Sequence, residues 1–302
     1  MTLPLLLLAA ALAGCSGGKS SDPVGGAVTP AVLSVVASFG PLAELAERVG
    51  GSAVKVTNLT KTGVEPHDLE MNTNQVDAVQ DAALVVYLGD GFQAAVDDAV
   101  KSRKGPSLDV LTKIDPIPAV AGGDVHGDHD PHFWLDPKRM AAAAESIRDE
   151  LSSVDPSRTK EFTSNAAAYV AEMMALNDQF MKGLTACKRR TFVTAHAAFG
   201  YLALRYNLTQ VSVAGISPEI EPDPARLAEV ADLVKEEGVT TIFTEELVSP
   251  KVAVALARET GAKTAVLSPI EGFSDDDIAA GSTYATKMRE NLNALKDALS
   301  CN

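Results

Sequence analysis

The chain is poor in cysteine, in histidine and in long apolar runs. Its 302 residues include 3 cysteines and 5 histidines. Beyond the N-terminal region, no stretch approaches the roughly 18 uninterrupted apolar residues of a membrane-spanning helix. Glycine-rich phosphate loops, Cys–His dyads and nucleophile elbows are also missing from the sequence. These absences argue against a membrane-embedded protein and leave no recognisable setting for nucleophilic catalysis.

Positive charge is also in short supply. Lys and Arg total 26 against 40 Asp and Glu, which gives a formal net charge of −14 spread along the chain. This balance disfavours binding to nucleic acid and to anionic lipid surfaces, and its field attracts cations. Apolar residues make up 46% of the sequence, which is ample for two hydrophobic cores in a chain of this length.

The N-terminus carries the longest apolar run. Residues 3–13 are too few to span a bilayer as a mature helix, and they indicate the apolar segment of a secretory signal. The run closes with Leu12-Ala-Gly-Cys15, which resembles the lipobox of bacterial lipoproteins, where the cysteine is lipidated. We therefore expect a signal peptide over 1–14, a lipid anchor on Cys15 and an extracytoplasmic protein held at the cell membrane. The alternative is an ordinary signal peptide in which Cys15 is incidental.

Two cysteines remain beside the lipidation candidate. In an oxidising compartment, Cys187 and Cys301 are expected to form a disulfide. It would close a loop of about 115 residues and stabilise the fold by about 4–5 kcal/mol in the chain-entropy model. The alternative is a pair of free buried thiols. A metal site on the thiolates is disfavoured, because neither cysteine has a metal-ligand neighbour close in sequence.

Short β-type runs alternate with helical patterns along the chain. Several of the helical patterns begin with a proline near the first turn, a favoured start position. Strands are expected at 32–36, 54–57, 83–88, 191–194, 240–243 and 263–267, and helices at 41–49, 93–101, 224–237 and 250–260. This alternation predicts an α/β fold in which mostly parallel sheets are flanked by helices.

One segment breaks the alternation. After Pro156 no proline occurs before Leu184, and apolar residues recur every three or four positions. This pattern predicts one helix, N-capped by Asp155 and about 43 Å long. We interpret it as a rigid strut between two lobes. The alternative is a single domain with one long surface helix.

The strut divides the sequence into parts. A flexible Gly- and Ser-rich tether is expected over 15–30. It is followed by an N-terminal α/β lobe over 31–154, the linking helix over 155–185 and a C-terminal α/β lobe over 186–302.

Three of the histidines lie in loop-like settings far apart in the sequence. His67 and His132 each follow a proline, which stiffens the loop. His196 follows the strand expected at 191–194, and open α/β sheets bind ligands beyond the carboxyl ends of their strands. Imidazole is the commonest side-chain ligand for borderline metals such as zinc. We predict that the three histidines meet in the inter-lobe cleft and bind a metal ion.

Several segments together resemble one family. The matching stretches are 63–70, 130–137, 194–202, 217–222 and 248–251, and 284–295 resembles the family's terminal helix. The chain, from about residue 31 to its end, is similar to the metal-binding receptors of bacterial ABC transporters. The similarity is strongest to the zinc branch, the zinc-uptake periplasmic protein A family. This resemblance implies two α/β lobes, a rigid linking helix and one metal ion in the cleft. It places His67, His132 and His196 at ligand positions.

The residue at position 196 favours zinc. The manganese and iron branch of the resembled family typically has a glutamate where His196 stands. Nitrogen ligands suit Zn²⁺, whereas Mn²⁺ prefers carboxylates and water. We therefore expect Zn²⁺ as the transported ligand. The alternatives are a manganese receptor of the same family and a zinc hydrolase or hydratase, because three histidines and a water also form a catalytic site. The lipobox, the two-lobe layout and the motif set favour a receptor that is not an enzyme.

The fourth ligand is left open by the sequence. Relatives often carry an aspartate in a Leu-Asp-Pro turn, and this chain has Ser268 at the corresponding position. Serine is a poor zinc ligand at neutral pH. We expect a water in its place, or Glu65, with Glu219 and Glu245 as further carboxylates to consider.

Other residues are expected to support the site. Residues 124–130 resemble a shortened His/Asp-rich loop, so His126 and His129 either capture metal secondarily or belong to a solvated polar loop. Asp136 either orients a ligand imidazole or caps the helix after Pro137. Phe133 and Trp134 are expected to pack at the lobe interface.

The resemblance also implies partners. A cognate permease of an ABC transporter receives the metal, and a metallochaperone is a further candidate partner. We expect a monomer that reaches the membrane through its lipid anchor only and does not bind nucleic acid.

Overall fold

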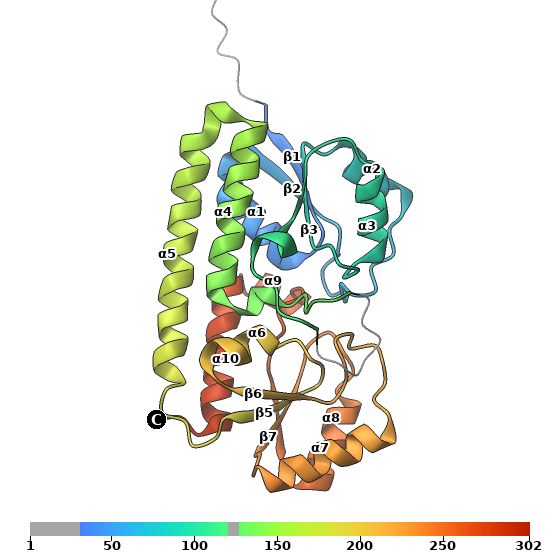
Figure 1. Ribbon diagram of the computed structural model, residues 1–302, viewed down its shortest axis with the longest axis vertical. Coiled ribbons are helices and arrows are strands. Elements are labelled where there is room, and N and C mark those ends of the chain that lie inside the picture. Colours follow the sequence, from blue (N-terminus) through green and yellow to red (C-terminus); the bar gives the residue numbers. More distant parts are fainter. Residues whose placement is uncertain (1–30, 120–126) are drawn as a thin grey trace, which may run out of the picture. The chain divides into compact units, whose positions relative to one another are not determined.

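Two four-stranded parallel sheets organise the computed structural model, which describes residues 31–119 and 127–302 (Figure 1). Their strand orders are β2-β1-β3-β4 and β6-β5-β7-β8. The predicted class, parallel sheets flanked by helices, is confirmed. The proposed signal peptide, the tether, Cys15 and His126 lie outside the described residues.

The first sheet is covered by helices on both faces (Figure 1). Val36 and Val85 pack with α2 and α3, whereas Val35 and Val86 point into the main core. Apolar residues on both faces of the strands are typical of parallel sheets. The strands are β1 (Leu33–Ala37), β2 (Val54–Asn58), β3 (Leu84–Tyr87) and β4 (Ser107–Asp109), and the helices between them are α1 (Gly40–Gly50), α2 (Thr73–Asp81) and α3 (Ala94–Lys101).

The second sheet repeats this alternation. Val193 and Ile242 pack in a small cluster with α7 and α8, whereas Phe192 and Phe243 join the main core. The strands are β5 (Thr191–Thr194), β6 (Thr209–Ser212), β7 (Thr241–Thr244) and β8 (Lys263–Val266). The helices are α6 (Gly200–Tyr206), α7 (Pro224–Glu236), α8 (Lys251–Thr260), α9 (Asp275–Ala279) and α10 (Tyr284–Leu299).

The six predicted strands are confirmed to within about two residues, and β4 and β6 are additional. Both additional strands lie at sheet edges and are short and partly polar, so they lack the apolar run by which the others are recognised. Short 3₁₀ turns complete the structure at η1 (Gly51–Ala53), η2 (Val110–Lys113), η3 (Phe133–Leu135) and η4 (Pro156–Arg158).

The long helix differs from its prediction at the first turn. Asp155 caps the 3₁₀ turn η4 by accepting the Ser157 N–H, and α5 itself runs over Thr159–Gly183, 25 residues. The predicted apolar stripe is buried along α5. The helix α4 (Pro137–Val154) lies beside it (Figure 1), and α5 also packs against α1 and α10. The long helix is therefore one member of a helical layer, not an isolated strut.

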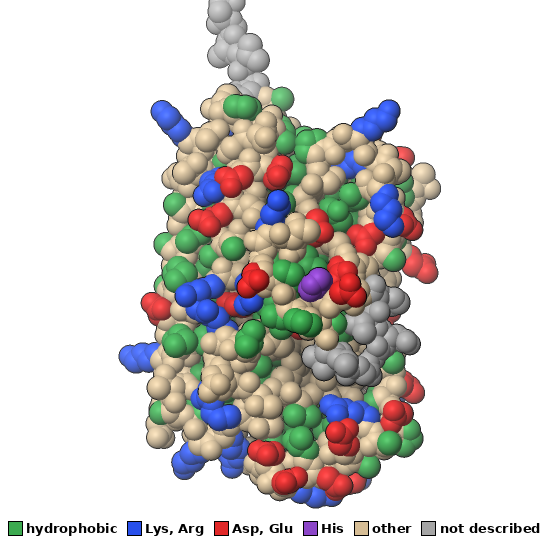
Figure 2. Space-filling model, viewed as in Figure 1, with side chains coloured by type: hydrophobic (Ala, Val, Ile, Leu, Met, Phe, Trp, Pro, Cys, Tyr) green, Lys and Arg blue, Asp and Glu red, His purple; other side chains and the backbone are tan. Residues whose placement is uncertain are grey.

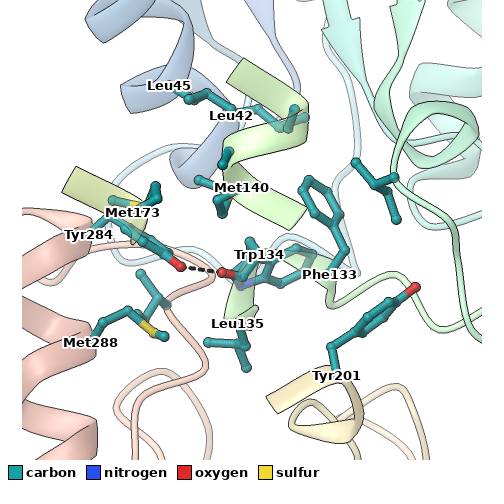
Figure 3. Close-up of a cluster of buried hydrophobic side chains, with 14 of the residues drawn as sticks. Leu42, Leu45, Phe133, Trp134, Leu135, Met140, Met173, Tyr201, Tyr284 and Met288 are labelled. Carbon is teal, nitrogen blue, oxygen red and sulfur yellow. Dashed lines mark hydrogen bonds between the residues drawn. The ribbon is translucent and has the colours of Figure 1, made fainter. Parts of the chain in front are cut away.

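The largest hydrophobic core is shared between residues of the two sheets, in contrast to the expected pair of cores. Phe39, Trp134, Phe192 and Tyr284 all belong to it, and Figure 3 shows Trp134 between side chains of both halves. The Tyr284 hydroxyl donates to the Trp134 carbonyl, and Trp134 Nε1 donates to the Pro269 carbonyl at 2.7 Å. These contacts tie the two halves of Val32–Asn302 into one compact unit.

Two further features bear on the sequence predictions. Cys187 and Cys301 form a disulfide across a sequence separation of 114 residues, which confirms that expectation. In the described parts of the chain, no helix has the length and apolar character needed to cross a membrane.

Candidate metal centre

Four side chains converge on one point in the described structure. They are His67, His132, His196 and Glu271, and their ligand atoms all lie within 4.8 Å of one another. Glu271 Oε1 is 3.2 Å from the Nε2 atoms of both His132 and His196, and 3.5 Å from His67 Nε2. The structure thus brings together the three histidines selected from the sequence and adds a carboxylate.

The four side chains come from loops at the two sheets. His67 lies between β2 and α2, and His132 begins the turn η3 ahead of α4. His196 directly follows β5, and Glu271 follows β8. The last three side chains are fully buried or nearly so, while that of His67 is 8% exposed. The group is therefore assembled from both halves of the chain and shielded from solvent on most sides.

Two carboxylates fix the orientation of two rings. Asp130 Oδ1 lies 2.7 Å from His132 Nδ1, and Glu245 Oε2 lies 2.7 Å from His196 Nδ1. An acceptor at Nδ1 keeps the proton there, so Nε2 is the nitrogen that faces the group.

Asp136 does not take part in this orientation. It caps α4 by accepting the Lys138 N–H at 2.9 Å, and it pairs with Arg139 at 2.7 Å. The capping alternative is therefore the one that the structure shows, and the orienting carboxylate of His132 is Asp130. Its sequence signal was its place two residues before the histidine.

His67 is held through its main chain and its ring face. Its N–H donates to Glu65 Oε1 at 2.9 Å, and its ring meets Phe92 edge-on with centroids 4.7 Å apart. Gln93 Nε2 donates to the carbonyl of Pro66 at 3.1 Å. The peptide group that joins Pro66 to His67 is thus held at both its carbonyl and its N–H.

The charges at the centre are strongly coupled. Burial by itself would raise the pKa of Glu271, but the charge of His196 and hydrogen bonds from the three imidazoles hold it well below its usual range. Burial also opposes the charge on His196, yet Glu245 and Glu271 together raise its pKa well above the ordinary value. Burial lowers the pKa of His67. Without metal, a buried carboxylate is therefore neutralised by protons on the surrounding imidazoles.

Glu65 lies beside the group but is not one of its members. Burial, aided by the nearby charge of Glu271, raises the pKa of Glu65 to about 9. Without metal, its carboxyl therefore carries a proton at neutral pH. Its second oxygen is buried without a hydrogen-bond partner among the described residues.

The fourth member of the group is Glu271. This residue was not among the candidates named for the fourth ligand. Glu245 instead bonds the Nδ1 atom of His196, and Glu219 lines a separate cavity. The available signal was a glutamate three positions after Ser268, in the same turn where a carboxylate was sought.

A small cavity of about 20 Å³ borders the group at His67, and Asp90 and His129 also line it. Asp90 Oδ2 accepts from the main chain of His129 at 2.8 Å and lies 3.0 Å from its Nδ1. His129 is therefore near the centre but outside the group of four.

Acidic and basic side chains are interspersed on the face drawn in Figure 2. This face does not carry the continuous basic surface that attracts nucleic acid.

The fold and the site together define a class. Two parallel α/β sheets with buried nitrogen and oxygen ligands gathered between them are the arrangement of a metal-binding α/β receptor. The chain belongs to the family described as zinc-uptake complex component A, periplasmic, whose profile matches residues 35–298.

Curated relatives agree with this placement. The zinc-binding protein AdcA of Streptococcus pyogenes serotype M6 is 37% identical over 285 residues, covering 87% of this chain and 55% of that protein. The chain thus spans about half the length of the AdcA proteins that it matches. The high-affinity zinc uptake system protein ZnuA of Bacillus subtilis is 34% identical over 305 residues, covering 97% of this chain and 94% of that protein.

Solved structures agree as well. The Zn(II)-bound ZnuA-like domain of Streptococcus pneumoniae AdcA is 36% identical with a TM-score of 0.76, over 89% of this chain and 99% of that one. The laminin-binding protein Lmb of Streptococcus agalactiae is 35% identical with a TM-score of 0.79, over 88% of this chain and 99% of that one.

Proposed function

We propose that this chain binds one Zn²⁺ through His67, His132, His196 and Glu271 and delivers it to the permease of an ABC importer. The observation that carries the proposal is the convergence of three imidazole nitrogens and one carboxylate oxygen within 4.8 Å. Four ligands of this kind match the tetrahedral preference of zinc, whereas Mn²⁺ favours more oxygen ligands and water. Zinc is therefore the proposed cargo, ahead of manganese.

The same ligand count argues against an enzyme. Catalytic zinc sites keep a coordination position open for water or substrate. Here a fourth protein group, Glu271, lies 3.2 Å from two of the three imidazoles and would take that position. A zinc hydrolase or hydratase is accordingly the less favoured function.

Delivery requires that the ligand set be opened. We propose an N-terminal lobe over 31–154 that supplies His67 and His132, and a C-terminal lobe over 186–302 that supplies His196 and Glu271, with 155–185 as the link. Moving the lobes apart would divide the ligands two and two. The shared core and the bond from Trp134 to Pro269 support a small movement rather than a wide one.

The location and partners follow from the same proposal. A lipid on Cys15 and the tether over 15–30 would hold the protein at the outer side of the cell membrane. The zinc-binding lipoprotein AdcA of Streptococcus pneumoniae serotype 4, 36% identical over 302 residues, supports this anchor. The permease is the principal partner, a metallochaperone is a further one, and the receptor acts as a monomer that binds no nucleic acid. His129, which lines the cavity beside the group, and His126 are proposed to capture metal secondarily.

Equilibrium dialysis of the demetallated protein against zinc tests the proposal. We expect one tightly bound zinc per chain and a loss of that site in His196→Ala. The control, His129→Ala, is expected to keep one tight site because His129 lies outside the group of four. A tight site that survives His196→Ala would contradict the proposed ligand set.

A further inference from the structure

The segment that presents Glu271 is fastened by hydrogen bonds from other parts of the fold. We propose that Asn291 in α10 is a positioning residue for Glu271: by clamping Ser268, it holds the carboxylate where the three imidazoles meet and so sets the zinc affinity. This inference rests on the proposed function, since it takes Glu271 to be a zinc ligand.

Asn291 bonds the main chain of Ser268 in both directions. Its Oδ1 accepts the Ser268 N–H at 2.8 Å, and its Nδ2 donates to the Ser268 carbonyl at 2.7 Å. Both residues are buried, with exposures of 2% for Asn291 and 4% for Ser268. Each of the four groups would be left unpaired in the interior without its partner, and that loss is costly. The clamp therefore fixes the start of the turn firmly to α10.

The turn itself has an unusual backbone. Ile270, directly before Glu271, has a φ of 54°, which a β-branched residue rarely adopts. Its N–H donates to Ser268 Oγ at 3.2 Å, and its side chain is buried. Such a conformation persists only where the surroundings over-determine it. Ser268, held by Asn291, supplies part of that constraint through its hydroxyl.

Two more hydrogen bonds fasten the segment on either side of Glu271. Trp134 Nε1 donates to the Pro269 carbonyl at 2.7 Å, and the Gly63 N–H donates to the Phe273 carbonyl at 3.1 Å. Both donors belong to the stretches that carry His132 and His67. The turn is thereby bonded to the same two loops that carry His132 and His67. Figure 3 shows Trp134 packed among side chains from α10.

A displaced carboxylate would lose its place in the group. Glu271 Oε1 is close to all three Nε2 atoms at once, at 3.2, 3.2 and 3.5 Å. Binding geometry is sensitive to shifts of about 0.5–1 Å. Ser268, the residue where relatives often have an aspartate, therefore acts as the anchor of the turn and leaves ligation to Glu271.

A double-mutant cycle tests the inference by zinc competition titration. Asn291→Ala is expected to weaken zinc binding about 10- to 100-fold, the usual effect of removing a group that orients a ligand. In a Glu271→Ala background, the same substitution is expected to change the affinity by less than about threefold, because its effect passes through Glu271. A merely structural role would lower the affinity equally in both backgrounds and would overturn the inference.

Asn177→Ala is the matched control. Asn177 is also a buried asparagine on a long helix, 5% exposed, but it bonds Arg205 at 3.0 Å and Asp178 at 3.1 Å instead of the Glu271 turn. We expect its zinc affinity to match that of the unmodified protein. An equal loss in Asn177→Ala and Asn291→Ala would contradict a specific role of the clamp.

Two safeguards keep the outcomes distinct. If far-UV circular dichroism shows that Asn291→Ala does not fold, Ser268→Ala, which loses one hydrogen bond to Ile270, takes its place in the same cycle with the same expected pattern. If the unmodified protein binds no zinc, the proposed function fails. If it binds zinc but the affinity of the clamp variant is unchanged, only this inference fails.

Discussion

The Nε2 atoms of His67 and His132, 65 residues apart in the sequence, face each other at 3.3 Å. Two ring nitrogens at this distance share at most one proton between them. Glu271 Oε1 lies within 3.5 Å of both nitrogens. The simplest account is that a cation belongs at this point and that protons occupy it when the cation is gone.

Glu271→Gln is expected to weaken zinc binding by more than about 100-fold. Positioning groups around a metal are worth about 10- to 100-fold, and loss of an anionic ligand exceeds that. The amide nearly preserves the volume, so the fold should be unaffected. A competition titration with a chromophoric chelator measures the change. An affinity equal to that of the unmodified protein would place Glu271 outside the coordination shell.

Glu65→Gln is the companion variant, with the opposite expectation for zinc. Glu65 lies outside the group of four, and glutamine keeps an oxygen that can accept the His67 N–H. We therefore expect zinc affinity within about threefold of the unmodified protein, short of the roughly 10- to 100-fold loss that follows removal of an orienting group. Loss of the zinc site in this variant would revive Glu65 as a ligand.

The same variant has a predicted effect on stability. The pKa of Glu65 is raised to about 9, so the folded protein holds this proton more tightly than the unfolded chain. Stability is then lost as the pH rises from the ordinary carboxyl pKa toward the raised value. Glu65→Gln removes that loss. Chemical denaturation of the metal-free proteins should show that the free energy of unfolding of the variant rises relative to that of the unmodified protein from about pH 5 to 9. A difference between the two proteins that stays constant with pH would refute this prediction.

Zinc affinity is expected to fall on acidification, and to begin falling above the pKa of free imidazole. Burial disfavours the charged form of His196, but Glu245 and Glu271 outweigh it and raise the pKa well above 6.5. Asp130 and Glu271 likewise outweigh burial at His132 and raise its pKa. Zinc binds only the deprotonated nitrogen, so protons compete at a higher pH than in an isolated imidazole. A titration series from about pH 8.5 to 5.5 measures this, and a flat profile would argue against a site dominated by histidine.

Removing the disulfide should destabilise the fold without altering the site. The Cys187–Cys301 bond spans a sequence separation of 114 residues, for which the chain-entropy model gives about 4–5 kcal/mol. Both cysteines pack against the main core, and neither belongs to the group of four. We expect the double Ser variant to unfold at lower urea concentration and to keep its zinc affinity when folded. A change in affinity at low urea would show coupling between the bond and the site.

The sequence predicted those parts of the fold that have a strong local pattern. The central strands β1, β3, β5 and β7 carry apolar runs, and α5 carries a stripe every three or four residues. The edge strands β4 and β6 do not, because their pairing is determined by neighbours far away in sequence. The shared core could not be foreseen either, since an apolar count cannot tell one core from two.

The site was predictable to the extent that its residues are rare. Histidine is scarce in this chain, and two of the three in the group follow prolines, so each stood out. Glu271 is one of 40 acidic residues, and its local signal is limited to its place three positions after Ser268. Its place at the centre depends on Asn291 and on the stretch around Trp134, contacts that arise only when distant segments fold together.

Competition between zinc and manganese for the demetallated protein decides whether this chain is a zinc receptor. Three nitrogen ligands and one carboxylate predict a single tight zinc site, with manganese bound more weakly by orders of magnitude. Manganese binding as tight as zinc, or tighter, would contradict the account and assign the chain a different cargo.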